Sequence, residues 1–316
     1  VVDSEKAEPL PNFDYKFMQG NSLVESYQGF DLSRIAGKSV GRPSTSKQYV
    51  IGLDSDLSRK NLQKLLHEYF SVTEHQQKAN MRHAINAEVK TLIRESFGGT
   101  PTSLAKLEQL DPSANQVFFL WHTWLKDIFD NGGFDIIIAN PPYVKEYTNR
   151  AAFDGFRETS PYYLGKMDLW YGFACHGLDM LKKDGVLCFI AQNNWTTSAG
   201  AKKMRNKVIK DSQILQMLDF NTYMVFENAD IQTMIMLFKQ NLKIDNYRFD
   251  YRIITQDNDK EDMLALLEKK ERNTKYMSPF INRNSFKDSL LTFSGDELIV
   301  DKIARNKTYL QAKEKI

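Results

Sequence analysis

The chain has 316 residues, of which 42% are hydrophobic and 26% charged, and 42 Lys and Arg against 40 Asp and Glu leave a formal net charge of +2. This ordinary globular composition excludes a disordered, collagen-like or disulfide-stapled chain. No apolar run approaches the roughly 18 residues that cross a bilayer. Because Cys175 and Cys188 have no Cys or His neighbours at metal-binding spacing, we expect a reduced cytoplasmic chain with no metal site.

The N-terminal part is predicted to consist of a short strand, a long loop and several helices. Residues 15–19 have strand character, and the polar stretch that follows, to about residue 56, is typical of a loop. Apolar residues at helical spacing predict two helices between residues 56 and 97, and Ser113 with Gln116 predicts a capping box that starts a third. We interpret residues 56–130 as a helical insertion.

From Phe134 onward the pattern changes to alternating strands and helices. Residues 134–139 form a continuous apolar run, which is typical of a strand buried on both faces of a parallel sheet. Helices are expected at 169–182 and 199–210, and further strands at 186–191, 214–220, 231–238 and 248–254. The alternation predicts an α/β fold with a mostly parallel sheet, and the close spacing of the last strands predicts an antiparallel pair at one edge.

The most informative motif, Asn140-Pro141-Pro142-Tyr143, stands where the first buried strand ends. Two consecutive prolines fix φ and remove two backbone N–H donors, so the turn is rigid and its carbonyl groups stay outside the ladder. In open α/β sheets, ligands bind beyond the carboxyl ends of the strands, where this motif is expected to lie. A polyproline turn is the plain alternative, but the combination with the strand, Asn140 and Tyr143 favours a ligand site.

Residues 134–143, Phe-Asp-Ile-Ile-Ile-Ala-Asn-Pro-Pro-Tyr, resemble motif IV of the S-adenosylmethionine-dependent amino-methyltransferases in their N6-adenine form. Four later segments resemble the following motifs in order and spacing: residues 166–173, 181–187, 192–195 and 225–231. Together they are similar to the methyltransferase part of type IIG restriction–modification enzymes, in which one polypeptide methylates, cleaves and recognises DNA. The resemblance implies an incomplete Rossmann-like methyltransferase sheet and methylation of adenine N6 in double-stranded DNA.

The resemblance implies that Asn140, Pro141, Pro142 and Tyr143 form the catalytic group. If the Asn140 side-chain oxygen and the Pro141 carbonyl each accept a hydrogen of the adenine amine, the nitrogen lone pair points at the methyl group, and catalysis comes from positioning. Flipping the base out of the duplex costs a few kcal/mol. Stacking on Tyr143 and Phe226, about 1–3 kcal/mol per base, is expected to offset this cost. An ordinary apolar side chain is the alternative for Phe226.

The resemblance also implies cofactor contacts from Asn21, Ser22 and Leu23, after the first strand, and from Asp168 and Phe173. A helix N-cap explains Asp168 equally well. The family's glycine-rich loop precedes the Asn21 segment, and no Gly-x-Gly occurs in this chain. We therefore expect the chain to be cut from a longer protein and to bind S-adenosylmethionine weakly or not at all. Low-micromolar affinity in a calorimetric titration would contradict that expectation.

We interpret residues 1–255 as the catalytic domain, truncated at its N-terminus, and residues 256–316 as a helical connector toward a target-recognition domain. The helix after residue 200 is strongly basic and is expected to contact DNA phosphates through Lys202, Lys203, Arg205, Lys207 and Lys210. A solvated helix face is the alternative. The sequence shows no nuclease constellation, so Mg²⁺ is expected only in a nuclease domain outside this chain.

Two other functions stay open from the residues alone. Asn-Pro-Pro-Tyr also occurs in protein-glutamine methyltransferases that act on a release factor, but the helical insertion and the segment after residue 255 favour DNA. A non-catalytic DNA-binding module would lose nothing on Asn140→Ala. Hydrolase and dehydrogenase motifs are absent from the sequence.

Overall fold

The computed structural model describes residues 14–37, 54–226, 231–241, 244–255 and 259–284, together with 286, 290, 291 and 293. The chain divides into two compact units. The first comprises Val1–Asn131 with Gly155–Ser160, and the second comprises Gly132–Asp154 with Pro161–Ile316.

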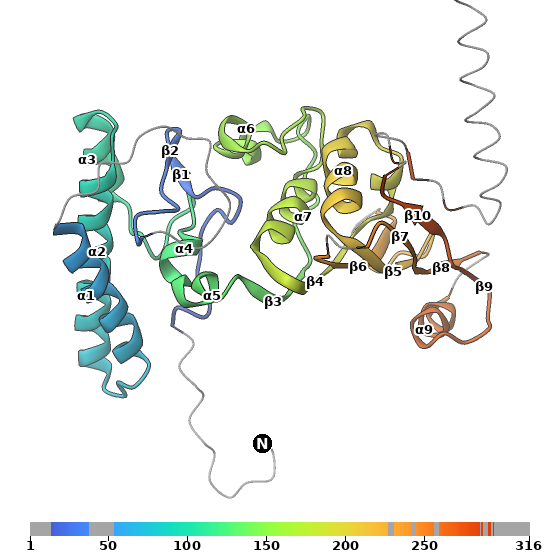
Figure 1. Ribbon diagram of the computed structural model, residues 1–316, viewed down its shortest axis with the longest axis horizontal. Coiled ribbons are helices and arrows are strands. Elements are labelled where there is room, and N and C mark those ends of the chain that lie inside the picture. The colour runs from blue at the N-terminus through green and yellow to red at the C-terminus, as the bar shows by residue number, and fades with distance from the viewer. Residues whose placement is uncertain are drawn as a thin grey trace, which may run out of the picture. The chain divides into compact units, whose positions relative to one another are not determined.

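The first unit is mainly helical (Figure 1). Its elements are β1 (Ser26–Tyr27), β2 (Phe30–Asp31), α1 (Asp54–Tyr69), α2 (His75–Ser96), α3 (Pro101–Gln109), α4 (Trp121–Trp124), α5 (Lys126–Asp130) and α6 (Phe156–Thr159). The two helices predicted between residues 56 and 97 are confirmed as α1 and α2, which pack side by side. The apolar stripe of α2 is buried at Ile85, Val89, Leu92 and Ile93.

Two local predictions for this unit are wrong. No helix begins at Ser113, because the Asp111 carboxylate accepts the Ser113 N–H, and the Asn115 side chain accepts the N–H groups of Val117 and Phe118. These side chains hold the backbone in turns instead of a helix. Residues 15–19 do not form a strand either. Gln19 makes an isolated bridge with Ala114, and Tyr15 has a φ of 57°, which interrupts an extended backbone.

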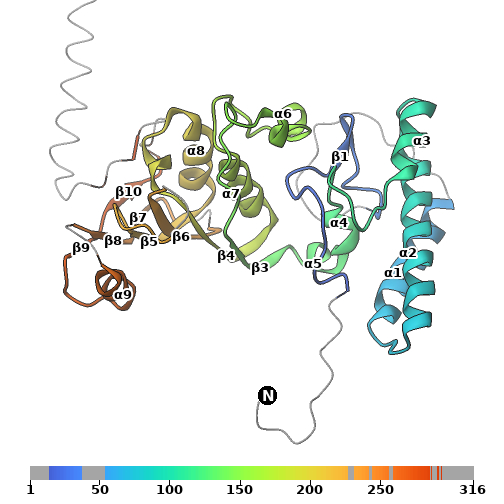
Figure 2. The ribbon, with the colours of Figure 1, turned by 180° about the vertical axis from the view of Figure 1, so that it is seen from behind.

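The second unit is built on a six-stranded sheet, seen nearly edge-on in Figures 1 and 2. The strand order is β3-β4-β6-β5-β8-β9. The strands are β3 (Phe134–Ala139), β4 (Leu181–Gln192), β5 (Gln213–Asp219), β6 (Thr233–Lys239), β8 (Asp250–Ile254) and β9 (Thr274–Met277). β3 is parallel to β4 and β5 is parallel to β8, whereas β6 is antiparallel to β4 and β5, and β9 to β8. Four strands therefore share one direction, as the predicted mostly parallel sheet requires.

Helices cover the sheet on both faces. Figures 1 and 2 show α7 (Leu169–Met180) and α8 (Lys202–Asp211) over one face and α9 (Lys260–Glu268) over the other. The helix α7 lies close to β4 because residue 177 is a glycine. A Cβ there would lie 2.4 Å from the Leu187 Cδ1 atom. Short 3₁₀ turns occur at Arg150–Phe153, Asn193–Thr196 and Ala199–Ala201.

The C-terminal part of the sheet differs from the prediction. The strand expected at 231–238 is β6, which lies inside the sheet, and the antiparallel pair at the edge consists of β8 and β9. After residue 255 only α9 is helical among the described residues. β9 returns to β8, and β10 (Phe280–Asn282) pairs with β7 (Asn246–Arg248). The helical interpretation of residues 256–316 was wrong for these segments, because α9 precedes β9, which extends the six-stranded sheet, and β10, which pairs with β7 in a separate two-stranded sheet.

Candidate functional site

The corner Asn140-Pro141-Pro142-Tyr143 begins where β3 ends, at the carboxyl edge of the sheet. Asn140 is exposed, Pro141 is buried and Tyr143 is half-buried. The Tyr143 hydroxyl lies 2.7 Å from the Asn140 Oδ1 atom and 2.9 Å from the carbonyl oxygen of Ile190 on β4. A hydroxyl has one hydrogen, so Tyr143 donates to either oxygen in turn. Tyr143 thus connects Asn140 to the neighbouring strand β4.

The Tyr143 hydroxyl stays protonated over the physiological range. Its burial raises the pKa of Tyr143 to about 12. It therefore acts as a hydrogen-bond donor, and the corner contains no side chain with a pKa near 7 that would serve as a general base. A geometry of fixed oxygen acceptors matches catalysis by positioning.

The chain after the corner is held against the start of α7. The Leu169 N–H donates to the Val144 carbonyl at 2.8 Å, and the Glu146 N–H donates to the Met167 carbonyl at 3.0 Å. An antiparallel bridge between Lys145 and Asp168 lies between these two bonds. Asp168 therefore pairs with Lys145, which follows Tyr143 by two positions in the chain.

Asp168 occupies the predicted N-cap position of α7, but its side chain makes no capping hydrogen bond. It is 6% exposed, its Oδ1 atom has no hydrogen-bond partner among the described residues, and its burial raises the pKa of the carboxyl group. A buried oxygen without a partner is costly unless a ligand supplies a donor. This orphaned acceptor fits an amine or hydroxyl of a bound cofactor, and Phe173 lies half-buried one turn farther along α7.

Phe226 lies beside Tyr143, as the prediction of two aromatic residues at the target base requires. The ring centroids are 6.2 Å apart and the ring planes are inclined by 54°. A base stacked between them needs about 3.5 Å on each side, or about 7 Å between the rings. The two rings contact each other in this arrangement, so they have to separate and become parallel to accept a base.

A buried network at the end of β5 was not recognised from the sequence. The Asp219 carboxylate is 6% exposed and accepts hydrogen bonds from the Asn193 side chain at 3.0 Å, the Asn221 N–H at 2.9 Å and the Tyr251 hydroxyl at 3.1 Å. The Asn221 side chain in turn donates to the Ile254 carbonyl. These bonds fix the turn that leads toward Phe226. The signal in the sequence was an acidic residue within an apolar strand.

Asn21, Ser22 and Leu23 belong to the first unit, so their role in the cofactor site stays a prediction. The Asn21 side-chain oxygen accepts the Leu23 N–H at 3.2 Å, and the Ser22 carbonyl accepts the indole N–H of Trp121 at 2.9 Å. Both groups therefore serve local structure.

The predicted phosphate contacts of α8 need correction. Arg205 is buried and donates to the carbonyl groups of Trp195 and Ser198, and the Lys203 ammonium donates to those of Pro161 and Tyr163. These side chains bind the protein's own backbone. Their donors are used in these internal hydrogen bonds, and α8 buries one face against the sheet.

Lys207 is also internal, with 4% of its side chain exposed, and it pairs with Asp179 at 2.7 Å and Asp211 at 3.0 Å. Burial, the largest single influence, lowers the pKa of Lys207, but the charge and hydrogen bond of Asp179 together with the contact to Tyr162 outweigh burial and raise the pKa. Lys202 and Lys210 are exposed on the helix surface. Of the five residues predicted to contact phosphates, Lys202 and Lys210 have the solvent exposure that such contacts require.

The described residues contain no group of three or more His, Cys, Asp and Glu side chains arranged to hold a metal ion. Within the same part of the chain, no helix combines the length and the apolar character needed to cross a membrane.

Two curated relatives are similar to parts of the chain. One is the type II methyltransferase M.BstVI of Geobacillus stearothermophilus, 26% identical over 106 residues, which is 33% of this chain and 19% of that protein. The other is the type II restriction enzyme and methyltransferase RM.Eco57I of Escherichia coli, 25% identical over 123 residues, which is 38% of this chain and 12% of that protein. The chain thus matches less than a fifth of the length of either relative.

Solved structures show only distant similarity. The type IIG restriction endonuclease BpuSI has 11% identity and a TM-score of 0.35, covering 73% of this chain and 27% of its own. A nuclease-deletion mutant of the type ISP restriction–modification enzyme LlaGI has 14% identity and a TM-score of 0.37, covering 90% of this chain and 31% of its own.

The family assignment rests on a match over more than half of the chain. The sequence model of the Eco57I restriction-modification methylase matches residues 48–226, a range that includes the helices of the first unit, the Asn140 corner and Phe226. This chain belongs to the Eco57I restriction-modification methylase family.

Proposed function

We propose that this chain is the methyl-transferring part of a DNA methyltransferase that modifies the N6 amine of adenine, within a bifunctional type IIG restriction–modification enzyme. The family match supports methylation of DNA, and the relatives named as restriction enzyme and methyltransferase support the bifunctional architecture. The observation that carries the adenine assignment is the Asn140 corner, whose amide oxygen is exposed and oriented by the Tyr143 hydroxyl.

The adenine amine is a weak nucleophile because its lone pair is delocalised into the ring. The Asn140 Oδ1 atom and the Pro141 carbonyl oxygen accept its two hydrogens and direct the lone pair outward. When the amine attacks, a nitrogen–carbon bond forms, the carbon–sulfur bond breaks with its electron pair going to sulfur, and the amine proton passes to solvent. Since Pro142 has no N–H and a fixed φ, the acceptors need little reorganisation during the reaction.

S-adenosylmethionine is the proposed methyl donor, and it supplies a sulfonium leaving group. Asp168 would bind it through the buried Oδ1 atom that lacks a partner among the described residues, and Phe173 would contact its apolar surface. Asn21 is proposed as a third contact.

The sheet is proposed to continue beyond β3 with a further strand. Within the described residues of the second unit, β3 pairs on one side only, with β4. Ile136 and Ile138 on β3 are 62% and 77% exposed, which is unusual for two adjacent apolar positions on one face of a strand. A covering element would also complete the cofactor site.

The proposal is tested by following the methyl group. The full-length protein that contains this chain is incubated with tritiated S-adenosylmethionine, duplex DNA and a release-factor substrate, and the DNA is digested to nucleosides. The proposed function predicts label in N6-methyladenine. Label in protein glutamine would support the alternative methyltransferase, and label in methylated cytosine would overturn the adenine assignment.

A further inference from the structure

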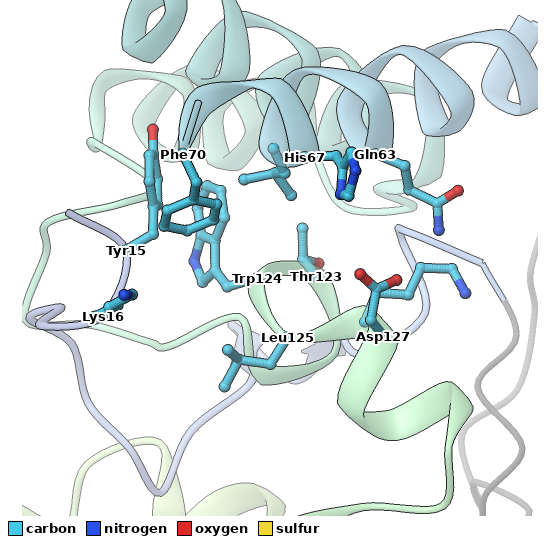
Figure 3. Close-up of a pocket in the computed structure, with 11 residues that line it drawn as sticks. Tyr15, Lys16, Gln63, His67, Phe70, Thr123, Trp124, Leu125 and Asp127 are labelled. Carbon is cyan, nitrogen blue, oxygen red and sulfur yellow. The ribbon is translucent and has the colours of Figure 1, made fainter. Parts of the chain in front are cut away.

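A cavity of about 330 Å³ lies within the first unit, between α1 and the short helices α4 and α5, and Figure 3 shows the side chains that line it. Lys16 and Asp127, two of its charged residues, are exposed and of opposite sign, so the lining does not single out a ligand. In the second unit, by contrast, a buried carboxylate follows shortly after Tyr143, and both of its oxygens have partners.

This carboxylate belongs to Glu146, which is 9% exposed. Its Oε1 atom accepts a hydrogen bond from the Tyr163 hydroxyl, and its Oε2 atom accepts the backbone N–H of Lys166 at 2.6 Å. A buried carboxylate is costly unless its oxygens are satisfied, so these two donors fix where the side chain lies. The Glu146 side chain therefore ties the chain just after the Asn140 corner to a turn 17 to 20 residues farther along.

The turn that Glu146 holds has an unfavourable backbone. Lys166 has a φ of 47°, in the left-handed region that a non-glycine residue rarely adopts, and Gly165 before it has a φ of 81°. The turn also packs closely on the 3₁₀ turn Ala199–Ala201, because a Cβ at Gly200 would lie 2.6 Å from the Lys166 carbonyl oxygen. Such a conformation persists only where surrounding contacts determine it, and the bond from the Lys166 N–H to Glu146 is one of them.

The same turn leads directly into Asp168. The Met167 carbonyl accepts the Glu146 N–H at 3.0 Å, and Lys145 and Asp168 form the antiparallel bridge beside it. These backbone contacts survive any substitution at position 146 other than proline. The Glu146 side chain adds the direction in which the chain enters the bridge, and with it the place of the Asp168 carboxylate relative to the corner.

We propose that Glu146 is a positioning residue that holds the Asp168 carboxylate at a fixed place beside the Asn140 corner, so that the methyl donor and the adenine amine meet in line. The inference rests on the proposed function, in which Asp168 binds S-adenosylmethionine and Asn140 binds the amine. Glu146 acts through Asp168 and contacts neither reactant. Alignment of this kind contributes to the rate because small displacements of reacting groups are costly.

Three substitutions in the full-length protein test this role. Glu146→Ala removes both acceptors and is expected to raise the Kd of S-adenosylmethionine, measured by calorimetry, and to lower the single-turnover methylation rate, each about tenfold. Tyr163→Phe removes one of the two donors and is expected to change each quantity about threefold. Glu146→Gln is expected to stay within about twofold of the parent protein, because its amide oxygen accepts the Lys166 N–H and its amide nitrogen donates to the Tyr163 hydroxyl oxygen.

Asp262→Ala is the control for lost stability. Asp262 is 1% exposed, and its carboxylate accepts the Asp259 N–H at 3.1 Å and a hydrogen bond from the Arg272 guanidinium at 2.7 Å, so its removal is also expected to lower the melting temperature. It belongs to α9, which covers the opposite face of the sheet from α7 (Figure 1), so the Kd and the rate are expected to stay parental.

Hydrogen exchange gives a local measurement that needs no cofactor. The backbone N–H groups of residues 163–168 are expected to exchange faster in Glu146→Ala than in the parent protein or in Asp262→Ala, because the acceptor that holds the turn is lost. Exchange of these groups that is as slow in Glu146→Ala as in the parent protein would overturn the proposal.

The binding and rate measurements have equally definite outcomes. A parental Kd and rate in Glu146→Ala, or a Glu146→Gln variant as impaired as Glu146→Ala, would overturn the positioning role. Equal losses in Glu146→Ala and Asp262→Ala would assign the effect to stability and overturn it as well. A parent protein that neither binds S-adenosylmethionine nor methylates DNA would overturn the proposed function itself, and this role with it.

Discussion

At the scale of single residues, we propose separate roles for the Tyr143 hydroxyl and the Tyr143 ring. The hydroxyl orients the Asn140 amide oxygen, at 2.7 Å, and the ring contacts Phe226. Both tasks follow from one position at the end of the corner. They can be separated by substitution, because phenylalanine keeps the ring and loses the hydroxyl.

We therefore predict that Tyr143→Phe lowers kcat about fivefold, the effect of one lost hydrogen bond, with little change in the KM for DNA. Tyr143→Ala also removes the stacking surface and is expected to raise the KM, since each stacked base contributes about 1–3 kcal/mol. Steady-state methylation of a duplex with a single target site measures both. Equal KM increases in the two variants would contradict the separate roles.

The rate is also expected to be independent of the ionisation of Tyr143 between pH 6 and about 10, because burial raises the pKa of this group to about 12. The single-turnover methylation rate of the parent protein and of Tyr143→Phe, measured as a function of pH, tests this expectation. A break near pH 8 that disappears in Tyr143→Phe would show that the tyrosine titrates during catalysis.

Asp219 is the second residue-scale test. Asp219→Ala leaves the Asn193 amide, the Asn221 N–H and the Tyr251 hydroxyl without their acceptor. We predict a loss of about 2–3 kcal/mol in the free energy of unfolding. Asp135→Ala, at an exposed ion pair with Lys182, is the matched control and is expected to cost less than about 1 kcal/mol. Urea denaturation compares the two, and similar losses would show that the Asp219 network is not cooperative.

The sequence predicted the Asn140 corner but not the Asp219 network, for a physical reason. The corner consists of four consecutive residues after one strand, so a short stretch of sequence is enough to recognise it. The network joins residues from the ends of β4, β5 and β8, and the pairing of these strands decides whether an aspartate inside an apolar strand meets three donors.

At the scale of elements, α8 shows why a basic helix is a weak sign of DNA binding. Its position was predicted, but which of its cations face solvent depends on the surfaces it packs against. Periodicity alone would not have placed Lys207 between Asp179 and Asp211, because Asp179 belongs to α7. The same limit applies to β9, whose return to β8 after α9 is a long-range pairing without a local pattern.

We predict opposite effects for two lysines of α8. Lys207→Met leaves two acidic groups without their buried cation and is expected to lower the free energy of unfolding by about 3–5 kcal/mol. Lys210→Met is expected to leave stability unchanged, weaken DNA binding uniformly across sequences and reduce the salt slope of the binding constant by about one. Chemical denaturation and DNA titrations at several salt concentrations measure both. An unchanged salt slope in Lys210→Met would remove α8 from the DNA interface.

At the scale of the whole molecule, the two compact units are expected to melt as separate transitions. The first unit contains a half-buried pair in which the Glu25 carboxylate accepts the backbone N–H of His122 at 2.8 Å and lies 2.6 Å from the His122 Nδ1 atom. Burial raises the pKa of Glu25. Burial, the largest single influence, lowers the pKa of His122, but the hydrogen bond to Glu25 and the negative charges of Glu25 and Asp31 together outweigh burial and raise the pKa. The folded pair therefore holds its proton more tightly than the unfolded chain.

The sign of the pH dependence follows. A raised folded pKa contributes stability that is complete below the unfolded value, about 6.5 for histidine, and is lost as pH rises through the folded pKa. We predict that the melting temperature of the first unit falls above pH 6.5, and that His122→Gln flattens this dependence. His83→Gln, an exposed histidine of α2, is the control. Calorimetric scans between pH 6 and 9 measure the melting temperature of each unit. A melting temperature of the first unit that stays constant while that of the second unit changes with pH would contradict the prediction.

In the proposed function, the Asn140 oxygen positions the adenine amine for methyl transfer. Single-turnover methylation by the full-length protein tests it most directly, comparing Asn140→Ala with Asn149→Ala, an exposed asparagine that caps the short turn after the corner. We expect a rate at least about 10²-fold lower for Asn140→Ala, with DNA binding retained, and a nearly unchanged rate for Asn149→Ala. A parental methylation rate in Asn140→Ala would contradict it.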